Sequence, residues 1–582
     1  YLQVPTPTSM VVRWRTDVAT DSRVRYGAAP GSLGTMIDDG ALVTDHEVAI
    51  TALAPDTQYF YSVGTTTAEL AGNDAAHHFR TSPPPGSAQP IRIWALGDSG
   101  FADPDACLLS PECDAPAVRD AYLALAGAND TDLLFLLGDN AYLTGTDAQF
   151  QEALFDMHAD FLRRVPPIPT FGNHEALSSN SAMETGPWFD MFTNPTAGEA
   201  GGVMSGTEAY YSMDYGNVHV IVLDSQGSSR EPGSAMLTWL ETDIMGATAD
   251  WIIAFWHHPP YSKGFFHDSD VEGREIDMRE NVVPILEANG VDLVLSGHSH
   301  NYERSYMLDG HYDFSPTLTG DMILDAGSGD PASDGAYRKA SLGAAPNEGA
   351  VYVVSGSASE VRNATLNHPA HRIGLLELGS LVLDVDGTTL SARFLNDAGA
   401  VTDTFTIVKG AAACPAAPRT GCEAGGKGKL VVKKGSATAG DGFVWKWKDG
   451  ALDVADLGDP LAETDLAVCL WDASGLLTGG GLPPGSGGAN PAWLPKGVGV
   501  AYRDAAASAA GVQKMRIKPG DASTAKLAVK GKGPNLGLPG ALAVTTPITA
   551  QLANLDGGTC WESVFTTTKK NGATKVVARV AP

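Results

Sequence analysis

Two histidines one residue apart, His298 and His300, follow the short apolar run at residues 291–295. In an extended segment, residues two apart point to the same face, so both imidazoles can reach a single site. Imidazole is a common metal ligand, and metal binding is therefore one interpretation of this pair. The other is a pair of surface histidines in a turn, because two-histidine spacings are short and common. Polar residues elsewhere in the chain must decide between the two.

Four other apolar segments, at residues 91–96, 132–137, 167–171 and 251–255, also end in polar side chains. Because sites in α/β sheets form at the carboxyl ends of the strands, we expect these side chains to meet at one sheet edge. A single Gly-Asp is more often a turn than a ligand, but five such segments in this order predict one site. The polar residues that follow the four segments are Asp98, Asp139, Tyr142, Asn173, His174, His257 and His258.

The chemical types in this set favour a site for two metal ions. Oxygen and imidazole ligands without a thiolate suit iron, zinc or manganese. A carboxylate has two oxygens and can bridge two ions, as two-metal phosphoryl-transfer sites with ions about 3.5–4 Å apart require. A phenolate is a hard anionic ligand, so Tyr142 favours Fe(III) over a divalent ion.

The elements that must position these residues alternate between strand and helix from about residue 90 to 411. This alternation predicts an α/β fold in layers. A hairpin is expected at residues 381–394, where Asp386-Gly387 forms the turn. Asp384 and Asp386 also suggest a calcium loop, but no glutamate stands at the closing position, so the hairpin is favoured. Helices are expected near residues 115–128, 146–163, 233–246 and 277–289.

The two flanking regions are predicted to be β-rich. Residues 1–86 show strand-length apolar runs, and residues 53–61 resemble the tyrosine corner of fibronectin type III domains. A Pro-rich linker at residues 81–87 separates this part from the next. Residues 412–582 are rich in Gly, Ala, Lys and Thr and predict a second β-sandwich or jelly roll. Their lysines look scattered, as on a solvated face.

Composition limits the partners. Lys and Arg number 39 against 68 Asp and Glu, a formal charge of −29, which argues against nucleic acid or an anionic membrane. No apolar run approaches the length that crosses a bilayer. An anionic substrate would be repelled unless metal ions reverse the field locally.

The six cysteines show no CxxC metal spacing, so disulfides in an oxidising compartment are the favoured interpretation and free thiols the alternative. We therefore expect a secreted, periplasmic or cell-surface protein. Six cysteines allow 15 connectivities. From the short local spacings we expect the pairs Cys107–Cys113, Cys414–Cys422 and Cys469–Cys560.

The blocks Gly97-Asp-Ser-Gly, Gly138-Asp-Asn-Ala-Tyr, Gly172-Asn-His-Glu, Ala254-Phe-Trp-His and Gly297-His-Ser-His resemble the five metal-binding blocks of the purple acid phosphatases. These belong to the calcineurin-like metallophosphoesterases. The fourth block departs from the usual pattern, having Ala at 254 and a histidine doublet. The resemblance covers about residues 1–411. It implies a four-layer αββα catalytic domain at 90–411 behind a fibronectin III-like domain at 1–86, and the β-rich domain at 412–582 lies outside it.

The resemblance also implies roles for individual residues. Fe(III) would be bound by Asp98, Asp139, Tyr142 and His300, and a divalent ion (Zn, Fe or Mn) by Asp139, Asn173, His257 and His298. Asp139 would bridge the ions, and His258 is the alternative to His257. His174 would face the phosphate. His267 lies where the family places a second substrate-facing histidine, although a simple surface histidine is equally compatible with the sequence.

The implied activity is hydrolysis of small phosphate monoesters through metal-bound hydroxide, with His174 and His267 as catalytic residues. One alternative is a phosphodiesterase or nucleotide-acting metallophosphoesterase, because the same metal core serves several esters. A non-enzymatic alternative is a cell-surface binding protein with a degenerate site. In either case residues 412–582 could bind a surface or a polysaccharide.

Overall fold

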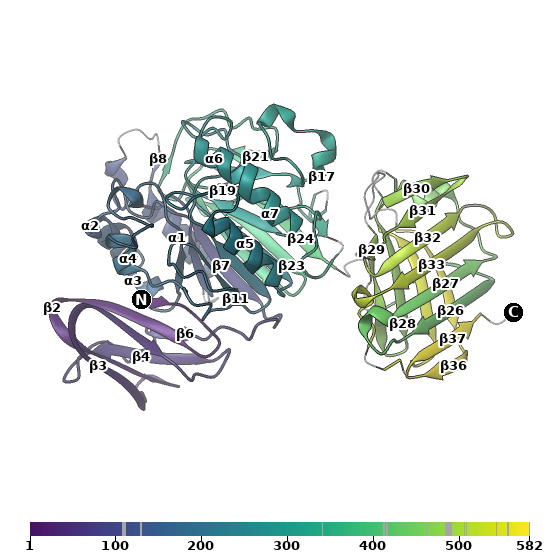
Figure 1. The fold of residues 1–582 in the computed structure, drawn as a ribbon, viewed down its shortest axis with the longest axis horizontal. Helices are drawn as coiled ribbons and strands as arrows, with labels where there is room; N and C mark the ends of the chain where they lie inside the picture. The colour runs from purple at the N-terminus through teal and green to yellow at the C-terminus, as the bar shows by residue number, and fades with distance from the viewer. Residues whose placement is uncertain are drawn as a thin grey trace. The chain divides into compact units, whose positions relative to one another are not determined.

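The computed structural model describes residues 1–582 except 108–111, 128–130, 334, 340, 411–413, 415–416, 462–463, 483–491, 506, 508, 540, 543, 556–557 and 581–582. The chain forms two compact units (Figure 1). The first comprises residues 1–337 and 343–407, and the second residues 338–342 and 408–582. Within the described residues, no helix is long and apolar enough to span a membrane.

Two seven-stranded sheets form the centre of the first unit. The first sheet contains β10 (Pro167–Pro169), β9 (Leu133–Leu136), β7 (Ile91–Leu96), β22 (Gly379–Asp386), β23 (Thr389–Asn396), β24 (Val401–Lys409) and β18 (Tyr337–Lys339), in that order. The second contains β11 (Tyr211–Tyr215), β12 (Val218–Val222), β13 (Trp251–Phe255), β14 (Leu293–Ser296), β19 (Val351–Ser355), β15 (Tyr302–Ser305) and β21 (His371–Leu375).

The central strands β9, β12, β13, β14 and β19 are buried on both faces because each sheet is covered twice. One side chain set, including Ile93, Phe135 and Phe255, fills the space between the sheets. The opposite faces pack against helices: α1 (Ala115–Ala126) lies against β22 and β23. On the second sheet, α5 (Ala235–Gly246) and α7 (Val283–Ala288) connect parallel neighbouring strands, so right-handed crossovers place both on one face. The expected αββα layers are confirmed (Figure 1).

The predicted helices are present, with interruptions. The segment expected near 146–163 consists of α2 (Asp147–Phe150), a π-helical stretch (Gln151–Asp156) and α3 (Ala159–Leu162). The segment expected near 277–289 contains α6 (Gly273–Asp277), a second π-helical stretch (Met278–Val282) and α7. The hairpin is confirmed too, since β22 and β23 pair up to Asp386 and Thr389 beside the turn.

The N-terminal strands form a bent sheet around their own core. Strand β2 (Met10–Gly27) pairs with β3 (Thr35–Ile50) along most of its length, and it changes its other partner from β1 (Leu2–Gln3) to β4 (Gln58–Gly64). Shorter strands β5 (Glu69–Gly72) and β6 (His78–Arg80) complete the sheet on β4. In the expected tyrosine corner, the hydroxyl of Tyr59 accepts a hydrogen bond from the backbone N–H of Ala54.

Two sheets build the second unit. The eight-stranded sheet contains β30 (Ala492–Lys496), β31 (Gly499–Arg503), β32 (Val512–Lys518), β33 (Lys526–Lys532), β27 (Gly442–Lys448), β26 (Lys427–Lys433), β37 (Lys575–Arg579) and β36 (Thr568–Gly572). The five-stranded sheet contains β25 (Glu423–Ala424), β35 (Cys560–Phe565), β34 (Ile548–Asn554), β28 (Leu466–Asp472) and β29 (Gly475–Leu482). Their inner faces share one core that includes Trp445, Trp493 and Trp561.

The disulfide pairing differs from the expected one in two of three bonds. Cys107–Cys113 is confirmed, but Cys414 pairs with Cys469 and Cys422 with Cys560. The sheet explains the difference: β25, which directly follows Cys422, runs parallel to β35, which begins at Cys560. The Cα atoms of Cys422 and Cys560 are therefore 4.6 Å apart, although 138 residues separate them in sequence.

The long-range disulfides should stabilise the second unit. Loss of a native disulfide typically costs about 2–5 kcal/mol, and the long loop closed by Cys422–Cys560 places it at the upper part of this range. The double substitution Cys422→Ser, Cys560→Ser should therefore speed hydrogen exchange of the β34 amides. The control Cys107→Ser, Cys113→Ser should leave those amides unchanged. Peptide mapping under non-reducing conditions that yields a Cys414–Cys422 link would contradict the structure.

Candidate metal centre

The predicted site residues lie at the ends of β7, β9, β13 and β14 and in the loop after β10. Three of them, Asp98, Asp139 and His298, have left-handed backbones with φ of 58°, 54° and 68°. Such conformations cost non-glycine residues about 1–3 kcal/mol and concentrate at functional sites. Each follows a glycine, and at Gly138 a Cβ would lie 2.5 Å from Nδ1 of His257. The packing is therefore too close for any larger residue.

A first donor group is formed by Asp98, Asp139, Tyr142 and His300. The hydroxyl of Tyr142 lies 2.9 Å from Oδ1 of Asp98, 3.4 Å from Oδ2 of Asp139 and 3.1 Å from Nε2 of His300. All four side chains are buried. Two carboxylates, a phenol and an imidazole thus converge within hydrogen-bonding distance.

A second donor group is formed by Asp139, Asn173, His257 and His298. Oδ1 of Asn173 lies 2.9 Å from both Nε2 of His257 and Nδ1 of His298. The two imidazole nitrogens are 3.2 Å apart, and Nε2 of His257 is 3.4 Å from Oδ2 of Asp139. Asp139 therefore belongs to both groups.

The outer contacts of three histidines determine which ring nitrogen of each faces the site. Nδ1 of His257 faces the carbonyl of Leu137 at 2.9 Å, and Nε2 of His298 faces the carboxylate of Glu272 at 2.9 Å. Nδ1 of His300 lies 2.5 Å from the carboxylate of Glu360. In the neutral form that a metal ligand requires, each imidazole keeps its proton on the outer nitrogen and presents a lone pair at the inner one. These lone pairs face the oxygens of the two donor groups, which a cation would bind.

The electrostatic field at the site is negative. Burial opposes the charged form of His257, yet the carboxylates of Asp139 and Asp98 raise its pKa to about 10. Burial likewise opposes a charge on His300, and Asp98 and Glu360 raise its pKa to about 9. Burial, followed by Asp98 and Asp139, raises the pKa of Tyr142 well above its ordinary value. Protons occupy positions here that metal cations would take, because metal ligands must lose their protons.

Three glutamates outside the predicted set hold the donors. Glu175 is fully buried and accepts the backbone N–H groups of Asp139, Asn140 and Gly172. It therefore fixes the turns that carry Asp139 and Asn173. Glu272 and Glu360 orient histidines, as carboxylates commonly do beside metal sites. Only Glu175 carried a sequence signal, since it closes the block Gly172-Asn-His-Glu.

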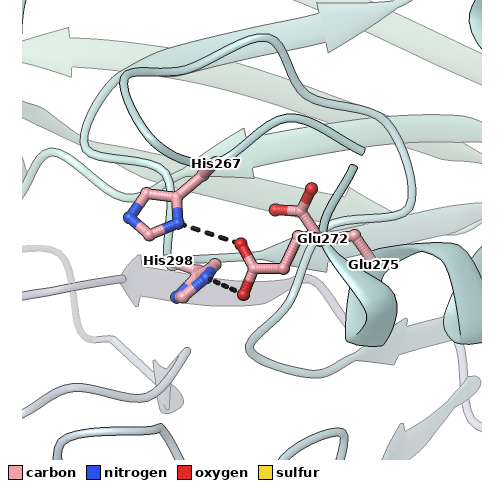
Figure 2. Close-up of side chains that lie close together, drawn as sticks. All are labelled: His267, Glu272, Glu275 and His298. Atoms are coloured by element: carbon pink, nitrogen blue, oxygen red, sulfur yellow. Dashed lines mark hydrogen bonds and ion pairs between the residues drawn. The ribbon is translucent and has the colours of Figure 1, made fainter. Parts of the chain in front are cut away.

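Glu272 connects the second donor group to His267 (Figure 2). Its two oxygens face Nδ1 of His267 at 3.1 Å and Nε2 of His298 at 2.9 Å. The two imidazole rings have centroids 3.8 Å apart. The structure thus places His267 beside the site.

His267, Glu272, Glu275 and His298 also bring possible metal ligands within 4.8 Å of one another. In this group, both His267 and His298 are hydrogen-bonded to the carboxylate of Glu272. Burial, with Glu272 and Glu303, raises the pKa of Glu275 well above its ordinary value.

His174 and His258 occupy different environments. Nδ1 of His174 donates to the carbonyl of Leu143 at 2.6 Å, and its Nε2 lies 3.8 Å from Oδ2 of Asp139. His174 is partly exposed beside the donor groups, where a substrate can reach it. His258 instead contacts the hydroxyl of Ser225 through Nδ1, and of the doublet only His257 lies in the second donor group.

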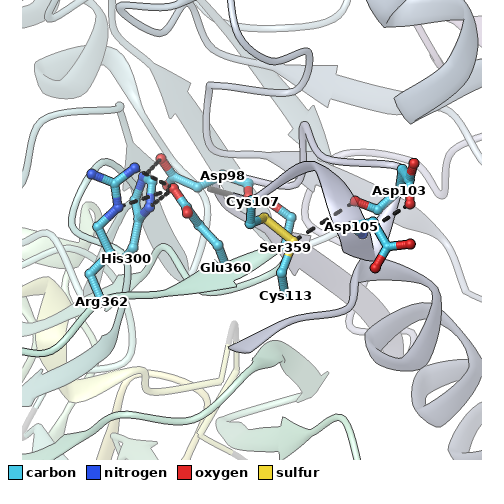
Figure 3. Close-up of a disulfide and its surroundings, with 9 residues drawn as sticks. All are labelled: Asp98, Asp103, Asp105, Cys107, Cys113, His300, Ser359, Glu360 and Arg362. Atoms are coloured by element: carbon cyan, nitrogen blue, oxygen red, sulfur yellow. Dashed lines mark hydrogen bonds and ion pairs between the residues drawn. A yellow bond between two sulfur atoms is a disulfide. The ribbon is translucent and has the colours of Figure 1, made fainter. Parts of the chain in front are cut away.

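The Cys107–Cys113 disulfide lies next to the first donor group (Figure 3). Cys113 belongs to β8 (Glu112–Cys113), which pairs with β20 (Glu360–Val361), so Cys113 is opposite Glu360. The hydroxyl of the preceding Ser359 donates to the backbone carbonyl of Asp98. The disulfide therefore links Cys107 to the strand that pairs with the Glu360 segment, which orients His300.

Two families match the chain in sequence. Residues 1–81 match the N-terminal domain of purple acid phosphatases, and residues 91–302 match the calcineurin-like phosphoesterases. Purple acid phosphatase 15 of Arabidopsis thaliana is 28% identical over 312 residues, covering 49% of this chain and 53% of the relative. The probable purple acid phosphatase 20 of the same plant is 27% identical over 317 residues, covering 51% of this chain and 66% of the relative.

The first two domains of the chain therefore resemble those of the purple acid phosphatases. The chain spans between about half and two thirds of the length of these two relatives. A solved purple acid phosphatase from yellow lupin (Lupinus luteus) seeds has the same fold, with a TM-score of 0.54, 18% identity, and coverage of 70% of this chain and 73% of that chain. Purple acid phosphatases of this superfamily use metal cofactors, and the two donor groups fit that chemistry.

The two outer carboxylates should control the binding of different ions. Glu272→Gln should weaken cation binding at the second donor group by about 10–100-fold, because His298 loses its charged partner. Glu360→Gln should weaken cation binding at the first donor group, because His300 then loses its charged partner. Metal content after dialysis against a chelator measures both effects. If both variants lost the same ion, the two carboxylates would not control different ions and the prediction would be contradicted.

Proposed function

We propose that the chain hydrolyses small phosphate monoesters at a dinuclear Fe(III)–M(II) centre, where M is Zn, Fe or Mn. The observation that carries this proposal is the shared Asp139 carboxylate between two donor groups whose lone pairs converge. Two ions at such a site can clamp a phosphoryl group and lower the pKa of a water molecule. Both effects promote direct attack of water on a phosphate ester.

Tyr142 supports iron in the first donor group. The negative field raises the pKa of its phenol, so a weakly polarising cation would not displace that proton. A trivalent ion competes with the proton far better than a divalent one at the same distance, because the Coulomb energy scales with charge. The second group has neutral Asn173, His257 and His298 besides Asp139, which suits a divalent ion.

The protein's own residues would handle the substrate. His174, held by the Leu143 carbonyl through Nδ1, presents Nε2 beside Asp139. From there it can donate a hydrogen bond to a phosphoryl oxygen or a proton to the leaving alcohol. His267 is oriented by Glu272 and lies against the ring of His298. It can also donate a hydrogen bond or a proton to the substrate. Phosphoryl transfer depends mainly on such positioning and charge stabilisation.

One observation favours a second candidate, a phosphodiesterase or nucleotide-acting enzyme. Phe265 and Phe266, directly before His267, have exposed fractions of 44% and 72%. Exposed aromatic rings at this position could stack on a flat leaving group such as a nucleobase. Relative rates on p-nitrophenyl phosphate and bis(p-nitrophenyl) phosphate separate the two candidates.

The disulfides support a location outside the cytoplasm. All three bonds lie among described residues, and disulfides persist mainly in oxidising compartments. We propose that the protein acts in the periplasm, at the cell surface or after secretion.

Asp139 should be essential for turnover. Asp139→Asn removes the charge shared by both donor groups, and kcat for p-nitrophenyl phosphate should fall by at least about 10²–10³-fold. Asp120→Asn, the same change at an exposed position on α1, should retain wild-type activity. Full activity of the Asp139 variant, measured with matched metal loading, would refute the proposed function.

A further inference from the structure

The second unit contains an eight-stranded sheet (Figure 1). The side of this sheet that faces away from the core, here called the basic face, carries exposed lysine and arginine side chains. Strand alternation separates the two sides: Phe443, Trp445 and Trp447 of β27 point into the core, while Lys446 and Lys448 are exposed. The same alternation recurs on β26, β32 and β33. None of the eight strands contains Asp or Glu. The lysines expected to be scattered are therefore gathered on one side.

The strand register places these charges next to one another. Lys448 is opposite Lys427 on one side and Lys526 on the other, and Lys526 is opposite Lys518. Four lysines thus stand in a row across β26, β27, β33 and β32, with strands about 4.8 Å apart. In a parallel row, Lys429 lies between Arg579 and Lys446.

This arrangement works against stability. Like charges directly opposite on neighbouring strands destabilise a sheet. Among the described residues of the row, only Lys427 has an ion-pair partner, Asp449 at 2.7 Å. The carboxylate of Asp449 also attracts Lys448 and Lys526, but one carboxylate beside four lysines leaves the row positively charged, so an external anion is a natural complement.

The charges of the chain are also strongly segregated. Residues 412–582 contain 19 Lys and Arg against 13 Asp and Glu, a formal charge of +6. Residues 1–411 contain 20 against 55, a formal charge of −35. At physiological ionic strength the screening length is about 8 Å. A polymer bound to the basic face therefore interacts mainly with the charges of that face, and little with the net charge of −29 of the whole chain. The overall charge consequently does not exclude an anionic partner.

The side chains on this unit indicate which polyanion fits. All eight aromatic residues in 412–582 are buried, and they are Phe443, Trp445, Trp447, Trp471, Trp493, Tyr502, Trp561 and Phe565. Single-stranded nucleic acids bind through base stacking on aromatic rings, and interfacial membrane proteins use exposed aromatics as anchors. The face offers neither. It offers regularly spaced ammonium groups, which bind carboxylate or sulfate without requiring the bidentate geometry of a guanidinium group.

We propose that the basic face binds an acidic polysaccharide, a linear polymer with repeating carboxylate or sulfate groups. The regular rows match repeating charges along such a chain, and the disulfides place the protein where such polymers occur. Binding would hold the catalytic unit at a polymer matrix while leaving its site residues uninvolved.

The full-length chain and two triple variants test this inference. The first variant carries Lys448→Gln, Lys518→Gln and Lys526→Gln; the matched control carries arginine at the same positions and keeps the charge. Binding is measured by surface plasmon resonance on immobilised heparin and polygalacturonate, with dextran as the neutral polymer and duplex DNA as the competing polyanion. Activity on p-nitrophenyl phosphate checks the catalytic unit independently, and it should be equal in all three proteins.

The wild type and the arginine variant should bind both acidic polymers, more weakly as salt rises, and should not bind dextran. The glutamine variant should bind about 10–100-fold more weakly. Its melting temperature should equal or exceed that of the wild type, because repulsion is removed. Equal binding by the glutamine variant would overturn the proposal. So would binding to DNA alone, or a lysine-dependent self-association without polysaccharide binding.

Discussion

The structure of the catalytic unit depends on one unfavourable arrangement: carboxylates, an amide oxygen and imidazole rings crowd together inside a buried site, where protons take the place of cations. His257, His298 and Asn173 bring their acceptors within 2.9–3.2 Å, and Asp139 stands beside them. Burying such groups without a partner is costly, because the desolvated charges and dipoles repel. Cations remove that cost and turn the repulsion into binding.

Much of the surrounding architecture maintains this arrangement. Left-handed backbones at Asp98, Asp139 and His298 aim the ligands, and close-packed glycines make room for those turns. Glu175 ties two of the loops together through backbone N–H groups. Glu272 and Glu360 fix the outer nitrogens of two histidines and thereby decide where the lone pairs point. Ligand geometry is thus set by residues that touch no ion.

The sequence predicted the donors because each follows an apolar run of strand length, and parallel strands end at a common edge. It did not predict Glu272 or Glu360, since an isolated glutamate before a short helix or in a two-residue strand carries no pattern. The pairing of Cys414 with Cys469 depended on which strands become neighbours, and local spacing does not contain that information. The basic face was missed for the same reason: alternating lysines become a continuous surface only once the strand register is fixed.

Metal content and the visible absorption spectrum of the purified chain test the dinuclear centre most directly. The account predicts two ions per chain, one of them iron, and a phenolate-to-iron absorption band that disappears in Tyr142→Phe while the fold is retained. A colourless protein that contains only zinc, or an absorption band unchanged by removal of the Tyr142 hydroxyl, would contradict it.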